Sequence, residues 1–371
     1  MPRLAIVANT AAPYRVPMFR LLARMPDVTL RVLFCSQREP NRLWDLPPID
    51  FDHVFMPGRF IRVGERYIHH NPGIFRCLSA FAPEVIVTDG FNPSHLYAFG
   101  YAVRHRVPHI PMTDGTLVSE RSLSALHRAV RRVVFARSAA FVSASGGGRR
   151  LYRSYGIASS RCFRSCLCVA NDAFAPPPQA AGKRYDFIFC GRFEPGKNPL
   201  FALEVAASTA RRLQRRCSIL YVGAGSLEPA VRAAALRQPD LVEAEFHGFA
   251  AQAELPRHYQ SASIFLFPTL ADVWGVVANE ACAAGLPTLA SPYAGAGGEL
   301  IVDGENGFIC ELDAELWAER AARLLTQPWL YRKFSRNSLA RVGDYTFEES
   351  ARGLLDACNA AWSATHGKSA P

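Results

Sequence analysis

The chain has 371 residues, of which 49% are hydrophobic and 20% charged. This composition is typical of a globular protein. The length is enough for two cores of roughly 100–200 residues each, which excludes a single small domain. No apolar run reaches the roughly 18 residues of a membrane-spanning helix, and the apolar stretch 4–7 is too short for a signal peptide, so we expect a soluble cytoplasmic protein. The ten cysteines lie singly apart from Cys166 and Cys168, which predicts buried free thiols and no metal site.

The net charge of +10 lies entirely in the first half, because residues 1–173 hold 23 Lys and Arg against 11 Asp and Glu. This asymmetry indicates an anionic partner, for which nucleic acid, an acidic membrane surface and a phosphorylated acceptor are the candidates. A solvated basic surface is the alternative.

Along the first half, short apolar runs alternate with longer helical patterns, which predicts βαβ units and a parallel sheet. The expected strands are residues 4–8, 29–34, 84–88, 109–113 and 140–143. A helix is expected over 121–137, with an apolar face that packs on the sheet and a basic outer face suited to anionic lipid. The apolar residues are Leu123, Leu126, Val130, Val133 and Val134, and the basic ones are Arg121, Arg128, Arg131, Arg132 and Arg137.

A proline-rich stretch at 174–184 is the strongest boundary, because three consecutive prolines bar both helix and central strand. We therefore expect a first domain over 1–173, a linker over 174–185, a second domain over 186–344, and a C-terminal helix and tail over 345–371. The second domain repeats the alternating pattern, with strands expected at 187–190, 218–222, 244–247, 264–267 and 288–291. The fold class is α/β, with two doubly wound, Rossmann-like domains that face a central cleft at the carboxyl ends of their strands.

The first motif of the second half follows its first strand and runs from Gly191 to Asn198. Arg192 and Lys197 flank a tight turn at a helix start, where a guanidinium, an ammonium and backbone N–H groups suit a diphosphate. Lys197 stands out because only four of the 42 basic residues are Lys. A surface turn with two solvated cations is the alternative.

Gly223 and Gly225 follow the next strand in a Gly-x-Gly pattern. Glu228 occupies the third position of a dinucleotide fingerprint, and a carboxylate there would repel a pyrophosphate. We therefore expect these glycines to let the backbone turn beside a ligand rather than to bind NAD.

The third motif follows the fourth strand and holds two carboxylates. Asp272 is expected at a helix start, with Glu280 eight residues on, about 2.2 turns later and on the same side of the cleft. Between them, the helix N-terminus at Gly275, Val276 and Val277 offers N–H groups to phosphate oxygens. A simple N-cap role for Asp272 is the alternative.

These motifs are followed by Gly-Leu-Pro at 285–287, Gly-Gly-Glu at 297–299 and Tyr-Thr-Phe-Glu-Glu at 345–349. In order and spacing, the set resembles the retaining glycosyltransferases of the GT-B fold, the group 1 or family-four class, whose last helix crosses back onto the first domain. The Ala-Pro-Tyr-Arg-Val-Pro run at 12–17 is similar to a subgroup of polysaccharide-building members, which suggests an acceptor-side role for Arg15.

The resemblance implies that Arg192 and Lys197 hold the donor diphosphate, that Glu280 accepts the ribose hydroxyls and that Asp272 contacts the transferred sugar. The family usually has Glu at position 272. A side chain one methylene shorter must approach the sugar more closely or act through water.

No metal is called for, because two cations and a helix end can neutralise a departing nucleoside diphosphate. No strong protein base is needed either, since the departing phosphate oxygen can take the acceptor's proton. Asp114, at the end of a first-half strand, is the carboxylate best placed by topology to orient the acceptor. The alternative is an Asp that merely starts the loop.

We hypothesise a metal-independent hexosyltransferase with no cofactor, whose donor is a UDP- or GDP-linked sugar. Its acceptor would be a lipid-linked or growing glycan of the exopolysaccharide, capsule or lipopolysaccharide type, at the inner membrane face. One alternative is a sugar phosphorylase or sugar-phosphate synthase of the same fold. Another is a basic nucleic-acid-binding protein, which is disfavoured because no nucleic-acid-binding motif is present.

Overall fold

The structure, a computed structural model, describes residues 2–26, 28–39, 44, 46–63, 66–121, 123–177 and 182–366. Chain contacts divide the protein into two compact units: unit 1 combines Met1–Leu167 with Phe347–Pro371, and unit 2 is Cys168–Thr346. Part of the linker expected over 174–185, residues 178–181, lies outside the described residues. The first crossover between the units comes earlier in the chain, because helix α7 (Asn171–Phe174) already packs on helices of unit 2.

Unit 1 is built on a parallel sheet that has seven strands within the described residues. In spatial order they are β3 (His53–Phe55), β2 (Thr29–Phe34), β1 (Arg3–Ala8), β6 (Val85–Thr88), β7 (His109–Thr113), β8 (Phe141–Ser143) and β9 (Cys162–Arg164). The order reverses direction between β1 and β6, which is the signature of a doubly wound sheet.

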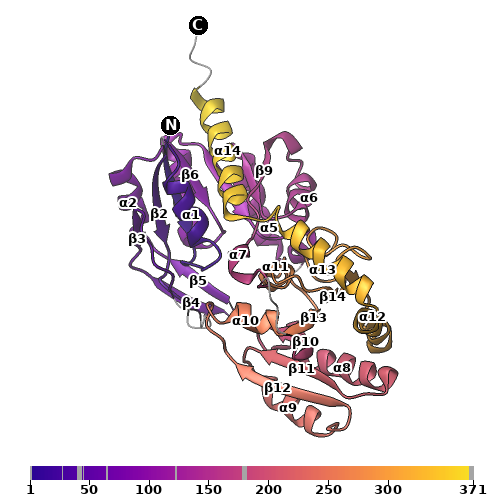
Figure 1. Cartoon of the computed structure of the whole chain (residues 1–371). Helices are drawn as coiled ribbons and strands as arrows, with labels where there is room; N and C mark the ends of the chain where they lie inside the picture. Colours follow the sequence, from indigo (N-terminus) through magenta and orange to yellow (C-terminus); the bar gives the residue numbers. More distant parts are fainter. Residues whose placement is uncertain are drawn as a thin grey trace. The chain divides into compact units, whose positions relative to one another are not determined.

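Both faces of this sheet are covered by helices (Figure 1). Alternate residues of β1 point to opposite faces, so Leu4 and Ile6 join one core and Ala5 and Val7 the other. The helices of unit 1 are α1 (Val16–Ala23), α2 (Ile74–Phe81), α3 (Pro93–His105), α4 (Leu117–Arg121), α5 (Ala125–Ala136), α6 (Gly146–Ser154) and α14 (Phe347–His366), with the 3-10 turn η1 (Ser159–Arg161).

Helix α14 returns from unit 2 and completes the core of unit 1 beside α1, as Figure 1 shows. Its buried residues include Leu354 and Ala357. The helix lies so close to β9 that a Cβ on Gly353 would sit 1.7 Å from the carbonyl oxygen of Arg164. The expected return of the last helix to the first domain is therefore confirmed.

A small antiparallel hairpin, β4 (Arg59–Val63) and β5 (Arg66–His70), stands apart from the main sheet and was not predicted. Its strands carry arginine and histidine among few aliphatic residues, so they lack the apolar run that marks a buried strand.

Unit 2 holds a second parallel sheet, with six strands within the described part. In spatial order they are β12 (Val242–Gly248), β11 (Cys217–Val222), β10 (Tyr185–Cys190), β13 (Ala262–Phe267), β14 (Thr288–Ala290) and β15 (Gly307–Ile309). The other helices are α8 (Pro199–Leu213), α9 (Glu228–Leu236), α10 (Leu255–Gln260), α11 (Val276–Ala283), α12 (Ala314–Thr326) and α13 (Pro328–Val342), with the 3-10 turn η2 (Pro195–Lys197).

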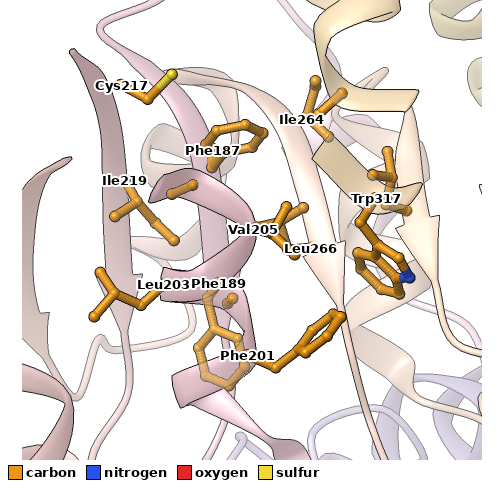
Figure 2. Close-up of a cluster of buried hydrophobic side chains, with 14 of the residues drawn as sticks. Phe187, Phe189, Phe201, Leu203, Val205, Cys217, Ile219, Ile264, Leu266 and Trp317 are labelled. Carbon is orange, nitrogen blue, oxygen red and sulfur yellow. The ribbon is translucent and has the colours of Figure 1, made fainter. Parts of the chain in front are cut away.

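The core of unit 2 lies between its sheet and helices α8 and α12 (Figure 2). Phe187 and Phe189 of β10 face Val205 of α8, and the Phe201 ring meets Trp317 of α12 edge to face at 5.2 Å. This core holds β10 and β13 as neighbours and so fixes where the loops after them begin.

All ten expected strands are present, and each of these ten matches its expected range to within two residues at either end. The expected helix over 121–137 is wrong in two respects. It is broken into α4 and α5, because Ser124 caps α5 by accepting a hydrogen bond from the His127 N–H. Its packed face also differs: Leu126 and Val133, expected to pack on the sheet, are 72% and 51% exposed.

The rotation of α5 has an identifiable cause. Phe135 packs edge to face on Phe91, Phe141 and Tyr152, which turns its side of the helix inward. The Arg131 side chain also points inward, because it pairs with the buried carboxylate of Glu120. Among the described residues, no helix is long and apolar enough to cross a membrane.

Candidate functional site

The predicted motifs of unit 2 gather at one edge of its sheet, around the point where the strand order reverses between β10 and β13. In open α/β sheets, ligands bind at the carboxyl ends of the strands at such a point. The loops that follow β10, β11 and β13 therefore form the candidate site.

The loop after β10 bends sharply and is braced by the loop after β11. Gly223 has a φ of +132°, and a Cβ there would lie 1.9 Å from the carbonyl oxygen of Gly191. The Phe193 N–H donates to the Ala224 carbonyl at 2.9 Å. The expected close backbone turn at Gly223 is therefore present, with the neighbouring loop as its contact.

Lys197 ends the 3-10 turn η2, and Asn198, with a φ of +55°, then starts α8. The Arg192 side chain is exposed on the same loop. The Thr269 hydroxyl and the Leu270 N–H both donate to the Gly196 carbonyl at 2.9 Å, which ties this loop to the segment after β13.

Lys197 and Asp272, which are 75 residues apart in the chain, form an ion pair. The Lys197 Nζ donates to Asp272 Oδ2, and the two side chains are only 26% and 12% exposed. The structure thus brings together the side chain expected to hold the diphosphate and the one expected to contact the sugar.

Asp272 does not lie at the start of a helix, which corrects both its expected place and its helical spacing from Glu280. Helix α11 begins four residues later at Val276, because Gly275 caps it with a φ of +90°. The Asp272 Oδ1 instead accepts a hydrogen bond from the Trp274 N–H at 3.2 Å. The carboxylate therefore organises the loop, while Val276 and Val277 form the first turn of α11, where N–H groups lack helical partners.

The loop that carries Asp272 is fixed from both sides. The Asp272 N–H donates to the Tyr293 carbonyl at 3.2 Å, and the Gly295 N–H donates to the Asp272 carbonyl at 2.9 Å. Trp274, 1% exposed, donates from its indole to Asn279 and packs on the Tyr345 ring at 5.4 Å. The site is thus supported by rigid packing rather than by a mobile loop.

Glu280 is buried in α11 and faces α10. The Tyr259 hydroxyl donates to Glu280 Oε2 at 2.8 Å, and the Gln252 amide lies 3.5 Å from Oε1. Burial raises the pKa of Glu280 from 4.5 to about 7, although the hydrogen bonds from Tyr259 and Gln252 oppose that rise. The second bond is long, so Oε1 is the oxygen best able to accept from a ligand.

A histidine pair joins the end of β12, which carries His247, to α10, which carries His258. The rings of His247 and His258 lie 4.1 Å apart, and burial, followed by the neighbouring His247, lowers the pKa of His258 to about 4. Tyr259 and this pair were not singled out from the sequence, since each is an isolated polar residue in a short helix or at a strand end.

In unit 1, Arg15 and Asp114 form an ion pair between Arg15 Nη2 and Asp114 Oδ1. Arg15 is buried and caps α1, and Asp114 follows β7. The two residues expected on the acceptor side are therefore neighbours. Sequence reasoning missed Asp89, which follows β6 and accepts hydrogen bonds from the Asn9 N–H and from His95 Nε2.

The arrangement in unit 2 suits an anionic ligand that also carries hydroxyl groups. A lysine, an exposed arginine and a helix N-terminus can bind phosphate oxygens, and two carboxylates can accept from hydroxyls. Among the described residues, no group of three or more His, Cys, Asp and Glu side chains is arranged to hold a metal ion.

The family model described as "Glycosyl transferases group 1" matches residues 171–341. The chain is 32% identical over 179 residues to a D-inositol 3-phosphate glycosyltransferase of Frankia alni, a match that covers 45% of this chain and 43% of that protein. The match thus spans less than half the length of the curated relatives.

Two solved structures are similar in fold over nearly the whole chain. Anabaena Alr3699/HepE in complex with UDP and glucose has a TM-score of 0.73 at 13% identity, over 97% of this chain and 100% of that one. A sucrose-phosphate synthase from Thermosynechococcus elongatus has a TM-score of 0.70 at 15% identity, over 98% and 100%. The expected GT-B fold is confirmed.

Proposed function

We infer that this chain, whose residues 171–341 belong to the group 1 glycosyl transferases, moves a hexose from a nucleoside-diphosphate sugar to a lipid-linked or growing-glycan acceptor. The observation that carries the proposal is the Lys197–Asp272 ion pair at the carboxyl ends of β10 and β13. A donor would offer its diphosphate to Lys197 and its sugar to Asp272, and Arg192 would add a second cation.

The proposed transfer retains the anomeric configuration and needs neither a metal nor a cofactor. Lys197, Arg192 and the N-terminus of α11 would neutralise the departing nucleoside diphosphate. The departing phosphate oxygen would take the proton of the acceptor hydroxyl. Arg15 and Asp114 in unit 1 would orient that acceptor, because their ion pair presents both a donor and an acceptor of hydrogen bonds.

The proposed acceptor lies at the inner membrane face, where the protein would bind peripherally. Residues 1–173 hold 23 basic and 11 acidic residues, and this excess of positive charge supports a location at the membrane. A second candidate is transfer to a soluble phosphorylated acceptor. The names of the Frankia alni relative and of the sucrose-phosphate synthase favour it, but the curated match covers only 45% of this chain.

A thermal-shift panel with UDP, GDP, ADP and CDP tests the donor site. A ligand at 100 times its dissociation constant stabilises a protein by about 2.7 kcal/mol, so one nucleotide should raise the melting temperature of the wild type. Lys197→Met should lose most of that shift. Lys333→Met, a matched change at an exposed lysine of α13, should keep it. Equal shifts in both variants would show that Lys197 does not bind the diphosphate.

Once the nucleotide is known, the product with a matching nucleotide sugar distinguishes the remaining parts of the proposal. Proton NMR of the new glycosidic bond should show the anomeric configuration of the donor. Activity that survives dialysis against EDTA would support metal independence. Label that enters only phosphorylated soluble acceptors would select the second candidate.

A further inference from the structure

The sheet of unit 1 has a switch point of its own, which plays no part in the candidate site of unit 2. Its strand order reverses between β1 and β6, and ligands of open α/β sheets bind outside the carboxyl ends of the strands at such a reversal. Asn9 follows β1 and Asp89 follows β6, while Asn92 and His95 lie at the start of α3. We call these four residues the Asp89 cluster. They lie at the edge of the sheet where the topology predicts a ligand.

Hydrogen bonds hold the Asp89 carboxylate in one orientation. The Asn9 N–H lies 3.2 Å from its Oδ1 and 3.3 Å from its Oδ2, and His95 Nε2 lies 2.9 Å from Oδ1. The Asn92 amide donates in turn to Asn9 Oδ1 at 2.9 Å. A Cβ on Gly90 would lie only 3.0 Å from His95 Cε1, so the glycine lets the imidazole pack against the loop. The Asp89 cluster is therefore held ready for a ligand by its own contacts.

Three atoms of the Asp89 cluster retain hydrogen-bonding capacity. Within the described residues, Asp89 Oδ2 accepts only from the Asn9 N–H that it shares with Oδ1, and neither Asn9 Nδ2 nor Asn92 Oδ1 has a partner. The Asp89 side chain is 20% exposed, so a ligand can reach its carboxylate. The edge of the sheet thus offers two acceptors and one donor of hydrogen bonds.

A bracing role alone does not explain the composition of the Asp89 cluster. A neutral amide would accept the Asn9 N–H as a carboxylate does, without the cost of taking a charge partly out of water. His95 is 1% exposed, and its Nδ1 is buried with no hydrogen-bond partner among the described residues. An unsatisfied buried nitrogen lowers the free energy of unfolding. Both features are expected where a carboxylate is oriented for a ligand rather than for the fold.

The chemistry of the Asp89 cluster favours hydroxyl groups over phosphate. A carboxylate repels phosphate oxygens, and no Lys or Arg in the described part of the chain pairs with Asp89 to offset that repulsion. A hydroxyl group both donates and accepts hydrogen bonds, so it can donate to Asp89 and accept from the Asn9 amide. A second, adjacent hydroxyl can donate to Asn92. Adjacent hydroxyls on a ring are characteristic of sugars, so a sugar is the ligand that the cluster fits.

We propose that the Asp89 cluster binds adjacent hydroxyl groups on the terminal sugar of the acceptor, with His95 as the positioning residue of Asp89. The proposal rests on the proposed function and deepens it, because it makes the acceptor the end of a glycan rather than a bare lipid phosphate. It uses none of the residues assigned above to donor or acceptor. The sugar of the donor is the other source of the same hydroxyl chemistry, and the test distinguishes the two.

The first measurement is saturation-transfer NMR of the full chain, with and without UDP or GDP, against methyl hexopyranosides of the gluco, galacto and manno series and their monodeoxy analogues. The wild type should bind at least one glycoside and should bind one of its deoxy analogues about tenfold more weakly. Asp89→Asn should weaken binding of the parent glycoside by about ten- to a hundredfold, because it removes a hydrogen bond to a charged group. This variant should no longer distinguish the parent from that deoxy analogue.

Asp356→Asn is the matched control, since it removes the same charge from an exposed position of α14 in unit 1, and it should leave glycoside binding unchanged. Equal losses in Asp89→Asn and Asp356→Asn would overturn the proposal. His95→Gln keeps an N–H donor for the carboxylate and should lose less than about threefold in affinity, whereas His95→Leu should lose about as much as Asp89→Asn. Equal losses in the two His95 variants would overturn its role as a positioning residue.

Calorimetry with UDP-glucose and UDP, and with GDP-mannose and GDP, separates the two sources of hydroxyl groups. Asp89→Asn should bind the nucleotide sugar and the bare nucleotide as the wild type does. Weaker binding of the nucleotide sugar alone would assign the Asp89 cluster to the donor and overturn the proposal. If the melting temperature shows that Asp89→Asn does not fold, Asn92→Ala carries the test, because it leaves every contact of Asp89 in place. It should weaken glycoside binding at least threefold, and unchanged binding would overturn the proposal.

The proposed subsite and the proposed donor site fail in different ways. A wild type that binds a nucleotide but none of the glycosides disproves the Asp89 cluster and leaves the donor site standing. Glycoside binding without any nucleotide binding has the opposite meaning.

Discussion

Lys197 and Asp272 neutralise each other, and this has a consequence for the proposed binding of a donor. A diphosphate must share the Lys197 ammonium with the Asp272 carboxylate or displace it. Both side chains are mostly buried, so this exchange takes place with little solvent screening. In the proposed donor complex, Asp272 would therefore oppose binding of the diphosphate alone, and its contribution would become favourable only when a sugar is attached.

The first prediction follows from this opposition. Asp272→Asn removes the carboxylate but keeps an oxygen for the Trp274 N–H. Binding of the bare nucleoside diphosphate, measured by calorimetry, should stay equal or become tighter. Turnover of the nucleotide sugar should fall by tens to about a hundredfold, because a charged hydrogen bond contributes about 1.5–3 kcal/mol.

Asp303→Asn is the matched control, since Asp303 also accepts a backbone hydrogen bond, from the Ile309 N–H, but is exposed. It should leave both nucleotide binding and turnover unchanged. An Asp272→Asn variant that loses stability but keeps its turnover would reduce Asp272 to a loop-organising residue.

Glu280 is the second residue with a marked energetic signature. Its pKa is about 7 in the folded chain, because burial penalises the ionised carboxylate, against 4.5 for an exposed glutamate. Between these two values the folded protein holds a proton that the unfolded chain has released. The free energy of unfolding must therefore fall as the pH rises through this interval, by up to about 3 kcal/mol.

Glu280→Gln should remove this contribution, because an amide does not titrate yet still accepts from Tyr259. Urea unfolding of both proteins at pH 5 and pH 8 measures it. The wild type should lose stability relative to the variant on going to pH 8, and other groups cancel because they titrate equally in both. Parallel pH profiles would show that Glu280 is ionised throughout.

At the scale of elements, the Asn171 side chain joins the segment that enters unit 2 to the segment that leaves it. Asn171, at the start of α7, donates from its amide to the carbonyls of Val342 at 3.1 Å and Tyr345 at 3.2 Å. Phe174, at the end of α7, packs on the Tyr259 ring at 5.9 Å. The Tyr259 hydroxyl donates to Glu280, so the outgoing segment is braced against the candidate site.

Asn171→Ala should destabilise unit 2 by about 1–3 kcal/mol, because it removes two hydrogen bonds that contribute about 0.5–1.5 kcal/mol each. Asn337→Ala is the control, since Asn337 makes one exposed bond, to the Glu305 carbonyl, and should cost less than about 0.5 kcal/mol. Chemical denaturation measures both. An Asn171→Ala variant as stable as the Asn337→Ala variant would show that Asn171 does not hold the crossovers together.

The sequence predicted the central strands well, because each is a short apolar run between turn residues. It missed β3, β9 and β15, three-residue strands at the edges of the two sheets, and the polar hairpin β4–β5. The packed face of α5 was wrong for a different reason. Periodicity treats arginine as outward-facing, whereas Arg131 turns inward to a buried glutamate 11 residues earlier.

For the site, the sequence identified Lys197, Asp272 and Glu280 as candidates but not which side chains each of them contacts. The pairing of Lys197 with Asp272 depends on the adjacency of β10 and β13, which a single sequence does not specify. The helix start was placed too early because the left-handed conformation of Gly275 ends the loop after Asp272. Tyr259 carries no motif, and only its contact with Glu280 reveals it.

At the scale of the whole molecule, the chemistry divides between the two halves of the chain. Residues 1–173 carry the excess positive charge, whereas the donor motifs lie in unit 2. This division favours a protein that binds its donor with one unit and meets an anionic, membrane-side acceptor with the other. The central claim is that a sugar passes from a nucleotide to that acceptor at Lys197 and Asp272.

The most direct test is a transfer assay with radiolabelled UDP- and GDP-hexoses, a membrane lipid extract and, separately, soluble sugar phosphates. Label from one nucleotide sugar should enter the lipid fraction with the wild type and with Asp303→Asn, and should be nearly absent with Asp272→Asn and Lys197→Met. If no nucleotide sugar is consumed with any acceptor, or if the two site variants transfer label as fast as the wild type, the account is contradicted.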